Sequence, residues 1–144
     1  MQHTEIIRLG AGLQIHILLD TLDTNRQFTL FKVIVEPAAK VPAAHYHDQF
    51  DETIYGLKGL LTLTIDGKTI ELAPGECCFV PKGAVHRFEN KTAESVELLA
   101  YAQSGVFGAT YFRELAEVIN VGGPPDAGKL KAIMLSYGLV PVSG

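Results

Sequence analysis

The sequence predicts an all-β domain followed by a pair of C-terminal helices. Short apolar segments recur up to about residue 105, and turns rich in Gly, Pro and Asp separate them. After residue 108 the spacing of apolar residues becomes helical. A chain of 144 residues is long enough for one domain with a single core. We therefore expect a β-sandwich or barrel over residues 1–107, and a helical hairpin over residues 108–144 that packs on the barrel or on a partner subunit.

Eight or nine short strands are expected in the first part of the chain. Leu13, Ile15 and Ile17 alternate with Gln14 and His16, which is typical of a strand with one buried face. An Asp-Gly pair at residues 66–67 lies between two apolar segments and predicts a hairpin, because glycine accepts the positive φ of a tight turn. The expected strands cover residues 13–19, 28–35, 43–47, 53–57, 60–65, 69–72, 77–80, 85–88 and 95–102. Residues 1–27 are compatible with further strands.

Two amphipathic helices are expected after residue 108. Each has four apolar residues at positions i, i+3, i+4 and i+7: Phe112, Leu115, Ala116 and Ile119 in the first helix, and Leu130, Ile133, Met134 and Tyr137 in the second. Asp126 is a suitable N-cap for the second helix, and Gly138 is a suitable stop. The two apolar stripes can pack on the barrel or on a partner subunit, or they can form a lid over the barrel mouth.

The composition disfavours a role in nucleic-acid binding or within a membrane. The chain has 12 Lys and Arg against 16 Asp and Glu, a formal net charge of −4, and no basic cluster that would neutralise phosphates. No segment approaches the roughly 20 apolar residues of a membrane-spanning helix, and the N-terminus does not look like a signal peptide. We therefore expect a soluble, cytoplasmic protein. The adjacent Cys77 and Cys78 should point to opposite faces of one strand and remain unbridged.

Three histidines and one glutamate are candidate metal ligands. His45 and His47 are two residues apart on an expected strand, so their side chains lie on the same face. Glu52 can return after a turn on the neighbouring strand, and His86 begins a later strand. This set suits one divalent Fe, Mn, Ni, Zn or Cu ion, with two positions open to water, substrate or dioxygen. Asp51 is an alternative to Glu52 as the fourth ligand, and a salt bridge is the alternative role for Glu52.

The spacing of these residues resembles the two sequence motifs of the cupin superfamily. The first motif is carried by His45, His47, Glu52 and Gly59, and the second by Gly75, Pro81, Gly83, His86 and Asn90. One departure is Ala39, which stands where the first motif begins with glycine, and which we expect to be a turn residue and not a ligand. The resemblance covers about residues 28–103.

The cupin resemblance implies a fold, a ligand set and an assembly. The implied fold is a single cupin β-barrel, also called a double-stranded β-helix or jelly roll, with the metal near its mouth. The implied ligands are His45, His47, Glu52 and His86, and the family pattern favours Glu52 over Asp51. The resemblance also suggests a homodimer.

The leading functional hypothesis is a metal-dependent dioxygenase that resembles small relatives of quercetinases and acts on a small organic substrate. Glu52 is then the candidate catalytic residue, because it can shift between metal ligation and proton acceptance. A metal-dependent isomerase or lyase is a second hypothesis, but it needs charged groups in the pocket, and Lys82 and Arg87 should point outward. A non-catalytic cupin that binds a small ligand is a third.

The remaining histidines and several aromatic residues have simpler interpretations. His3 and His16 belong to neither motif and are expected to be solvated or structural. Five aromatic residues are candidates for the pocket wall, although plain core packing explains each of them: Tyr55, Phe88, Tyr101, Tyr111 and Phe112.

Overall fold

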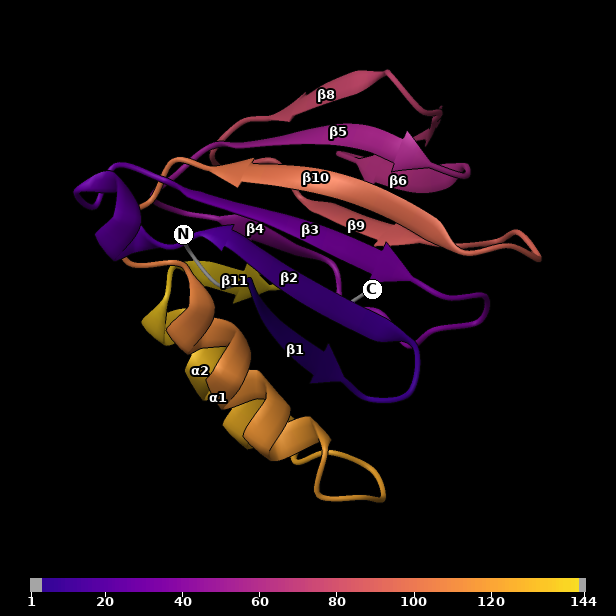
Figure 1. Cartoon of the computed structure of the whole chain (residues 1–144). Coiled ribbons are helices and arrows are strands. Elements are labelled where there is room, and N and C mark those ends of the chain that lie inside the picture. The colour runs from indigo at the N-terminus through magenta and orange to yellow at the C-terminus, as the bar shows by residue number, and fades with distance from the viewer. Residues whose placement is uncertain (1–3, 143–144) are drawn as a thin grey trace.

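Two antiparallel β-sheets pack against each other in the computed structural model, which describes residues 4–142. The six-stranded sheet has the order β1 (Glu5–Leu9), β2 (Leu13–Leu19), β3 (Thr29–Val35), β10 (Val96–Ala102), β5 (Glu52–Lys58) and β8 (Cys77–Val80). The five-stranded sheet has the order β11 (Leu139–Pro141), β4 (His45–His47), β9 (His86–Glu89), β6 (Leu61–Ile65) and β7 (Lys68–Leu72). Figure 1 shows the larger sheet from β8 to β1. The arrangement is a jelly roll, as the sequence predicts.

Alternating residues place one face of each sheet in a shared core. Leu13 and Ile15 of β2 and Phe31 of β3 are buried, whereas the residues between them are partly exposed. From the other sheet, Leu61 and Leu63 of β6 belong to the same hydrophobic cluster and are almost inaccessible to solvent. Each fully buried side chain of this size stabilises the fold by roughly 1.5–3 kcal/mol. The core between the sheets is therefore the main source of stability.

The hairpin predicted at Asp66-Gly67 joins β6 to β7. Both residues have positive φ, 47° and 81°, as a two-residue turn of this kind requires. The turn is also fixed to the chain that precedes β9. The Asp66 amide donates to the Val85 carbonyl at 2.8 Å, and the Val85 amide donates to the Asp66 carboxylate at 2.9 Å. These two hydrogen bonds fix the position of Val85, the residue next to His86.

Two helices, α1 (Ala109–Ile119) and α2 (Ala127–Ser136), follow β10 and lie side by side, with α1 against β1 and α2 against β11 (Figure 1). Tyr111, Phe112 and Leu115 of α1 are buried in the same hydrophobic cluster as the sheet residues. The predicted N-cap of α2 is confirmed, because the Asp126 side chain accepts the Lys129 amide at 3.1 Å. Helix α1 thus packs on the barrel of its own chain.

The start of α1 is held by a residue far away in the sequence. The Asp20 carboxylate accepts the Ala109 amide at 3.1 Å and the Thr21 amide at 2.9 Å. It therefore caps both α1 and the short 3-10 helix η1 (Thr21–Thr24). A Cβ atom at Gly108 would collide with the Asp20 carboxylate, so the close approach requires glycine.

Three described elements were not predicted individually: β1, η1 and β11. The tail ends in a strand, so the helical hairpin occupies only part of residues 108–144, and the boundary at residues 107/108 stays a prediction. Cys77 and Cys78 are unbridged, as expected. No described helix is long and apolar enough to cross a lipid bilayer. The prediction for His3 lies outside the described residues.

Candidate metal centre

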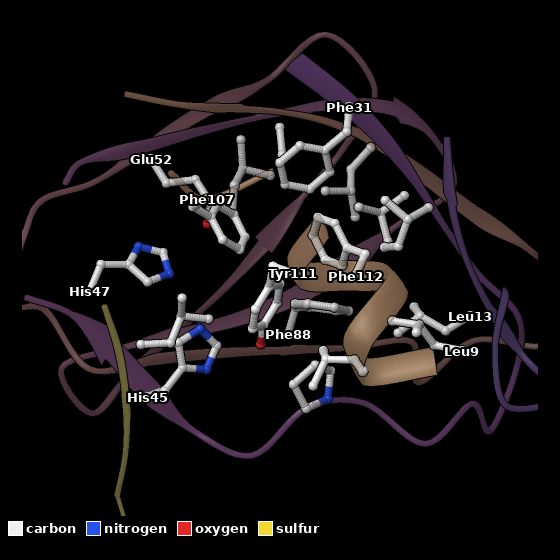
Figure 2. A pocket seen from close by; sticks show the side chains of 18 of the residues that line it. Leu9, Leu13, Phe31, His45, His47, Glu52, Phe88, Phe107, Tyr111 and Phe112 are labelled. Atoms are coloured by element: carbon white, nitrogen blue, oxygen red, sulfur yellow. The ribbon is translucent and has the colours of Figure 1, made fainter. Parts of the chain in front are cut away.

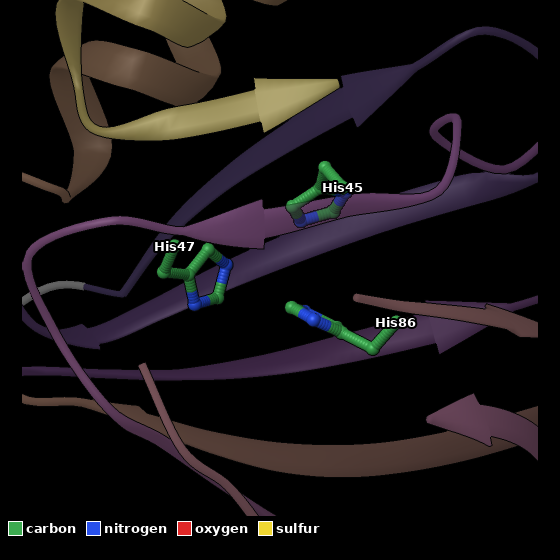
Figure 3. Close-up of side chains that lie close together, drawn as sticks. All are labelled: His45, His47 and His86. Carbon is green, nitrogen blue, oxygen red and sulfur yellow. The ribbon is translucent and has the colours of Figure 1, made fainter. Parts of the chain in front are cut away.

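Three histidines from neighbouring strands converge inside the jelly roll (Figure 3). His45 and His47 point inward from β4, and His86 lies directly opposite His45 on β9. The ring centroids are 4.6 Å apart for His45 and His86, 4.7 Å for His47 and His86, and 5.2 Å for His45 and His47. One nitrogen from each ring lies within 4.8 Å of the other two. The two sequence motifs therefore meet as predicted, in a group that can hold a metal ion.

Strand β4 has only three residues, so its neighbours fix its position. On one side, β11 pairs Leu139 with His47 and Pro141 with His45. On the other side, His45 pairs with His86. The Gly83 amide donates to the His47 carbonyl at 2.9 Å, and the positive φ of Gly83, 90°, allows this turn. The glycine of the second motif thus supports a ligand of the first.

Backbone carbonyls orient two of the three imidazole rings. His45 Nδ1 lies 2.8 Å from the Ala43 carbonyl oxygen, and His86 Nδ1 lies 3.0 Å from the Ala84 carbonyl oxygen. A carbonyl only accepts, so each Nδ1 carries the proton and leaves Nε2 free to bind a metal. His47 is held differently, because its ring stacks on Phe50 at 4.3 Å, and its buried Nδ1 has no hydrogen-bond partner among the described residues.

Burial keeps the histidines neutral and therefore ready to bind a cation. Desolvation, followed by the charge on His86, lowers the pKa of His45 to about 4. The same two effects, with His45 as a third, place the pKa of His47 still lower. Desolvation also lowers the pKa of His86. A metal ligand must be deprotonated, so all three rings are in the required form near neutral pH.

Glu52 enters the same space from the facing sheet. It begins β5 of the six-stranded sheet, so it does not return on a strand next to β4 as the sequence suggested; the turn carries the chain across to the other sheet. Glu52 Oε1 lies 3.8 Å from His86 Nε2. Desolvation raises the pKa of Glu52 to about 7, while the pKa of His86 is lowered. The pair is thus not a stable charged salt bridge at neutral pH. The ligand and catalytic roles of Glu52 stay predictions.

The rival ligand Asp51 has another role in the described structure. Its carboxylate accepts the Lys82 amide at 2.7 Å, and its carbonyl accepts the Gln103 amide at 3.0 Å. It therefore fixes the turn before His86, and unlike Glu52 it does not line the cavity beside the histidines.

The histidines and Glu52 line a cavity of about 70 Å³ (Figure 2). This space holds a few water molecules or a small organic group. Fourteen of its nineteen lining residues are apolar, and the other five are His45, His47, Glu52, His86 and Tyr111. Neither Lys nor Arg lines the cavity within the described part of the chain, and Lys82 and Arg87 are exposed, as expected. The cavity thus offers metal-binding and proton-accepting groups, but no fixed positive side chain.

The C-terminal part of the chain forms one wall of this cavity. Phe107, Tyr111, Phe112 and Leu115, together with Leu139 of β11, line it. Tyr111 is 2% exposed, and burial, followed by the Glu52 charge, raises the pKa of its phenol, which stays protonated. The helical spacing predicted that this segment is apolar, but no local signal says that its tyrosine faces the metal site.

Other aromatic candidates divide into two groups. Phe88, Tyr111 and Phe112 line the cavity. Tyr55 lies on the outer face of β5 and is 40% exposed, and Tyr101 packs on Phe28 on the outer face of β10, so neither is a pocket residue. Alternation explains this result, because each lies an odd number of positions from an inward-facing neighbour on its strand.

The donor set fits a divalent transition metal ion. Three neutral imidazoles with unused nitrogens surround a common point, and a buried carboxylate adjoins them. The buried His47 Nδ1 lacks a protein partner among the described residues. Imidazole and carboxylate together suit Fe, Mn, Ni, Zn and Cu and do not select one of them.

Comparisons with known proteins agree with this fold. A family model described as a cupin domain matches residues 31–101. An uncharacterized protein of Aquifex aeolicus is 32% identical over 100 residues, which are 69% of this chain and 80% of the relative. Quercetin 2,3-dioxygenase of Bacillus subtilis is 30% identical over 111 residues, 76% of this chain. The matched region spans only 32% of that enzyme.

Solved structures give the same result. A sugar phosphate isomerase from a cupin superfamily, from Silicibacter pomeroyi, is 26% identical with a TM-score of 0.58, and the match covers 70% of each chain. An RmlC-like cupin from Shewanella frigidimarina is 22% identical with a TM-score of 0.60, covering 71% of this chain and 85% of the other. The second similarity concerns the fold alone.

Proposed function

This chain belongs to the cupin superfamily, and on that premise we propose that it is a metal-dependent dioxygenase that acts on a small, mainly apolar organic substrate. The chemical character of the cavity wall carries the proposal. Apolar residues surround the histidine group, and neither Lys nor Arg faces it within residues 4–142. A substrate with a phosphate or several charges would lose its hydration there without gaining an ion pair. A ring or chain with few oxygen atoms suits the wall better.

Each part of the site has a distinct role in this proposal. His45, His47 and His86 hold the ion, with Glu52 as the fourth ligand. When bound, the ion supplies Lewis acidity and a place where substrate and dioxygen are brought together. Glu52 would accept a proton from a substrate hydroxyl group when its carboxylate leaves the ion. The wall from Phe107 to Leu115 keeps water away from the reacting atoms.

A sugar phosphate isomerase is the second candidate, because a structural relative of that description is 26% identical over 70% of both chains. That activity needs no dioxygen, but it needs a partner for the phosphate. The basic residues nearest to the second motif, Lys82 and Arg87, are exposed, and Arg87 lies 3.6 Å from Glu89. The cavity therefore favours the oxygenase proposal over the isomerase.

The decisive experiment measures oxygen consumption by protein loaded in turn with iron, nickel, copper, manganese or zinc. Catechols and flavonols serve as substrates, and ¹⁸O₂ establishes whether both oxygen atoms enter the product. The control is His86→Ala treated with the same metals. The proposal is supported if oxygen consumption requires His86 and both ¹⁸O atoms appear in the product. Oxygen-independent conversion of a sugar phosphate would replace it with the isomerase. Saturable binding without any turnover would identify a ligand-binding protein.

A further inference from the structure

We infer that the Tyr111 hydroxyl group is a hydrogen-bond donor to the substrate, and that the substrate is a small ring compound with an oxygen acceptor beside its metal-facing oxygen. The inference rests on the proposed function, which supplies the substrate site, and adds a recognition residue that lies outside the two cupin motifs. Tyr111 belongs to α1, beyond residues 31–101 that the cupin model matches.

The Tyr111 side chain is buried, and its hydroxyl group forms no hydrogen bond with another described residue. The side chain is 2% exposed and lines the cavity. Figure 2 shows the ring inside the cavity, with its hydroxyl group toward the side where His45 lies. The hydroxyl group is therefore open to the cavity that Tyr111 lines, where a bound molecule with an acceptor atom would accept its hydrogen bond.

Aromatic neighbours fix the direction of the ring. Its centroid is 5.0 Å from that of Phe107, 5.1 Å from Phe112 and 5.3 Å from Tyr137. The start of α1 is itself fixed by the hydrogen bond between Asp20 and the Ala109 amide. The donor is therefore preorganised, and it gives a bound ligand a hydrogen bond without first losing much rotational freedom.

The rest of the cavity defines the class of ligand. Tyr111 supplies the one polar group that the C-terminal wall offers, since Phe107, Phe112, Leu115 and Leu139 are apolar. Phe31 and Phe88 add further ring faces, and such surfaces favour a planar apolar body. The neutral Tyr111 hydroxyl group and the candidate metal site lie at different places in the cavity. Together they favour a small ring that carries two oxygen atoms, as catechol does.

The test compares two probes and two variants. Zinc-loaded protein, which is not redox active, is titrated calorimetrically with catechol and with phenol, which lacks the second oxygen atom. The variant Tyr111→Phe removes only the hydroxyl group. The matched control Tyr137→Phe removes a hydroxyl from the aromatic neighbour that does not line the cavity. Zinc content and melting temperature are measured for each protein.

We expect Tyr111→Phe to bind catechol about 5- to 15-fold more weakly, the effect of one net hydrogen bond. Phenol binding should change less than twofold, and so should both affinities in Tyr137→Phe. This selective loss separates recognition of the second oxygen from a general change in packing.

Three results would overturn the inference: unchanged catechol affinity in Tyr111→Phe, an equal loss for phenol, or an equal loss in Tyr137→Phe. Failure of the wild-type protein to bind catechol would overturn the ligand class. Selective binding without any oxygen consumption by the iron-loaded protein would leave the inference standing and contradict the dioxygenase proposal. Oxygen consumption that does not depend on Tyr111 would support the dioxygenase proposal and contradict the inference about Tyr111.

Discussion

Two parts of the chain line the same cavity, and they contribute different things to it. The region that matches the cupin model supplies every candidate metal ligand: His45, His47, Glu52 and His86. The segment after residue 103 supplies an apolar wall and the hydroxyl group of Tyr111, but no further group that binds metal among its described residues. The comparison teaches that the candidate ligands come from one stretch of sequence, whereas the apolar wall is shared, because residues 9–15 and the cupin region line the cavity together with the tail. Variants in the two parts should therefore fail in different ways.

The largest expected effect is a loss of stability when an apolar side chain of the tail, which is part of the core, is truncated. Phe112 is 6% exposed and packs on Phe31 at 5.1 Å and on Phe107 at 5.3 Å. Phe112→Ala should lower the free energy of unfolding by about 3–5 kcal/mol, because it leaves a cavity in the core. Urea denaturation measures this loss. The control Val121→Ala, at a position 77% exposed, should change stability by at most about 0.5 kcal/mol. A loss below about 1 kcal/mol for Phe112→Ala would mean that the tail is a detachable lid.

Loss of a histidine in the cupin region should affect metal binding first. His86→Ala removes one of three converging imidazoles and should weaken metal affinity by at least about 100-fold, more than loss of a supporting contact usually costs. Competition with a chelator measures the affinity. The matched control is His16→Ala, because His16 lies on β2, outside the group that can hold a metal. Equal metal retention in His86→Ala and the wild type would contradict the site.

The stability of the metal-free protein should depend on pH, and His45 and Glu52 should change it in opposite directions. Burial lowers the pKa of His45 from 6.5 to about 4, so its stabilising effect is present above pH 6.5 and is lost as the pH falls toward 4. Burial raises the pKa of Glu52 from 4.5 to about 7, so its favourable effect is present below pH 4.5 and is lost as the pH rises through 7. At pH 8 the buried Glu52 carboxylate should therefore destabilise the protein.

Glu52→Gln tests this sign directly. Without metal, the variant should be more stable than the wild type at pH 8, on the order of 1–3 kcal/mol, and similar to it at pH 4.5. Melting curves of protein treated with a chelator, recorded from pH 4.5 to pH 8, measure the difference. With metal bound the order should reverse, because the carboxylate then faces a cation. Identical curves for both proteins would show that Glu52 is not desolvated.

The smallest effect is expected at an exposed ion pair between the tail and β1. Arg113 of α1 forms a bidentate ion pair with Glu5 of β1, at 2.7 Å and 2.6 Å, and 51% of the Arg113 side chain is exposed. Arg113→Ala should cost less than about 1 kcal/mol, and high salt should reduce the difference. Chemical denaturation at two ionic strengths measures it. A loss as large as that of Phe112→Ala would mean that the tail depends on this ion pair and not on its apolar face.

The features that could be predicted from the sequence are those with a local period or a fixed spacing. Alternation located β2 at residues 13–19, and the Asp66-Gly67 pair located the hairpin between β6 and β7. The helical spacing and Asp126 located α2. The two motifs named the three histidines that meet. For the strands and helices the signal lies within about ten residues, where the geometry of one element determines which side chains share a face. The motifs are longer, over residues 39–59 and 75–90, and were identified by resemblance to a family.

The features that could not be predicted depend on distant parts of the chain. Strand β11 has three residues, too few to show a period, and exists because it pairs with β4. The cap of α1 comes from Asp20, 89 residues away. The sequence placed Glu52 on the strand next to the histidines, because it does not say whether a turn stays in one sheet or crosses to the other. It also gives no local sign that Tyr111 faces the cavity.

The pairing of β11 with β4 has a consequence for the order in which the site is completed during protein synthesis. His45 and His47 gain their neighbour on one side from residues 139–141, about ninety residues later in the chain. The amide of Val142 and the carbonyl of Gly138 extend this contact to Ala44 and Asp48. Such distant contacts form slowly, and a ribosome makes the N-terminal part first. A nascent chain therefore carries all four candidate ligands well before it carries β11, the strand that pairs with the strand of two of them.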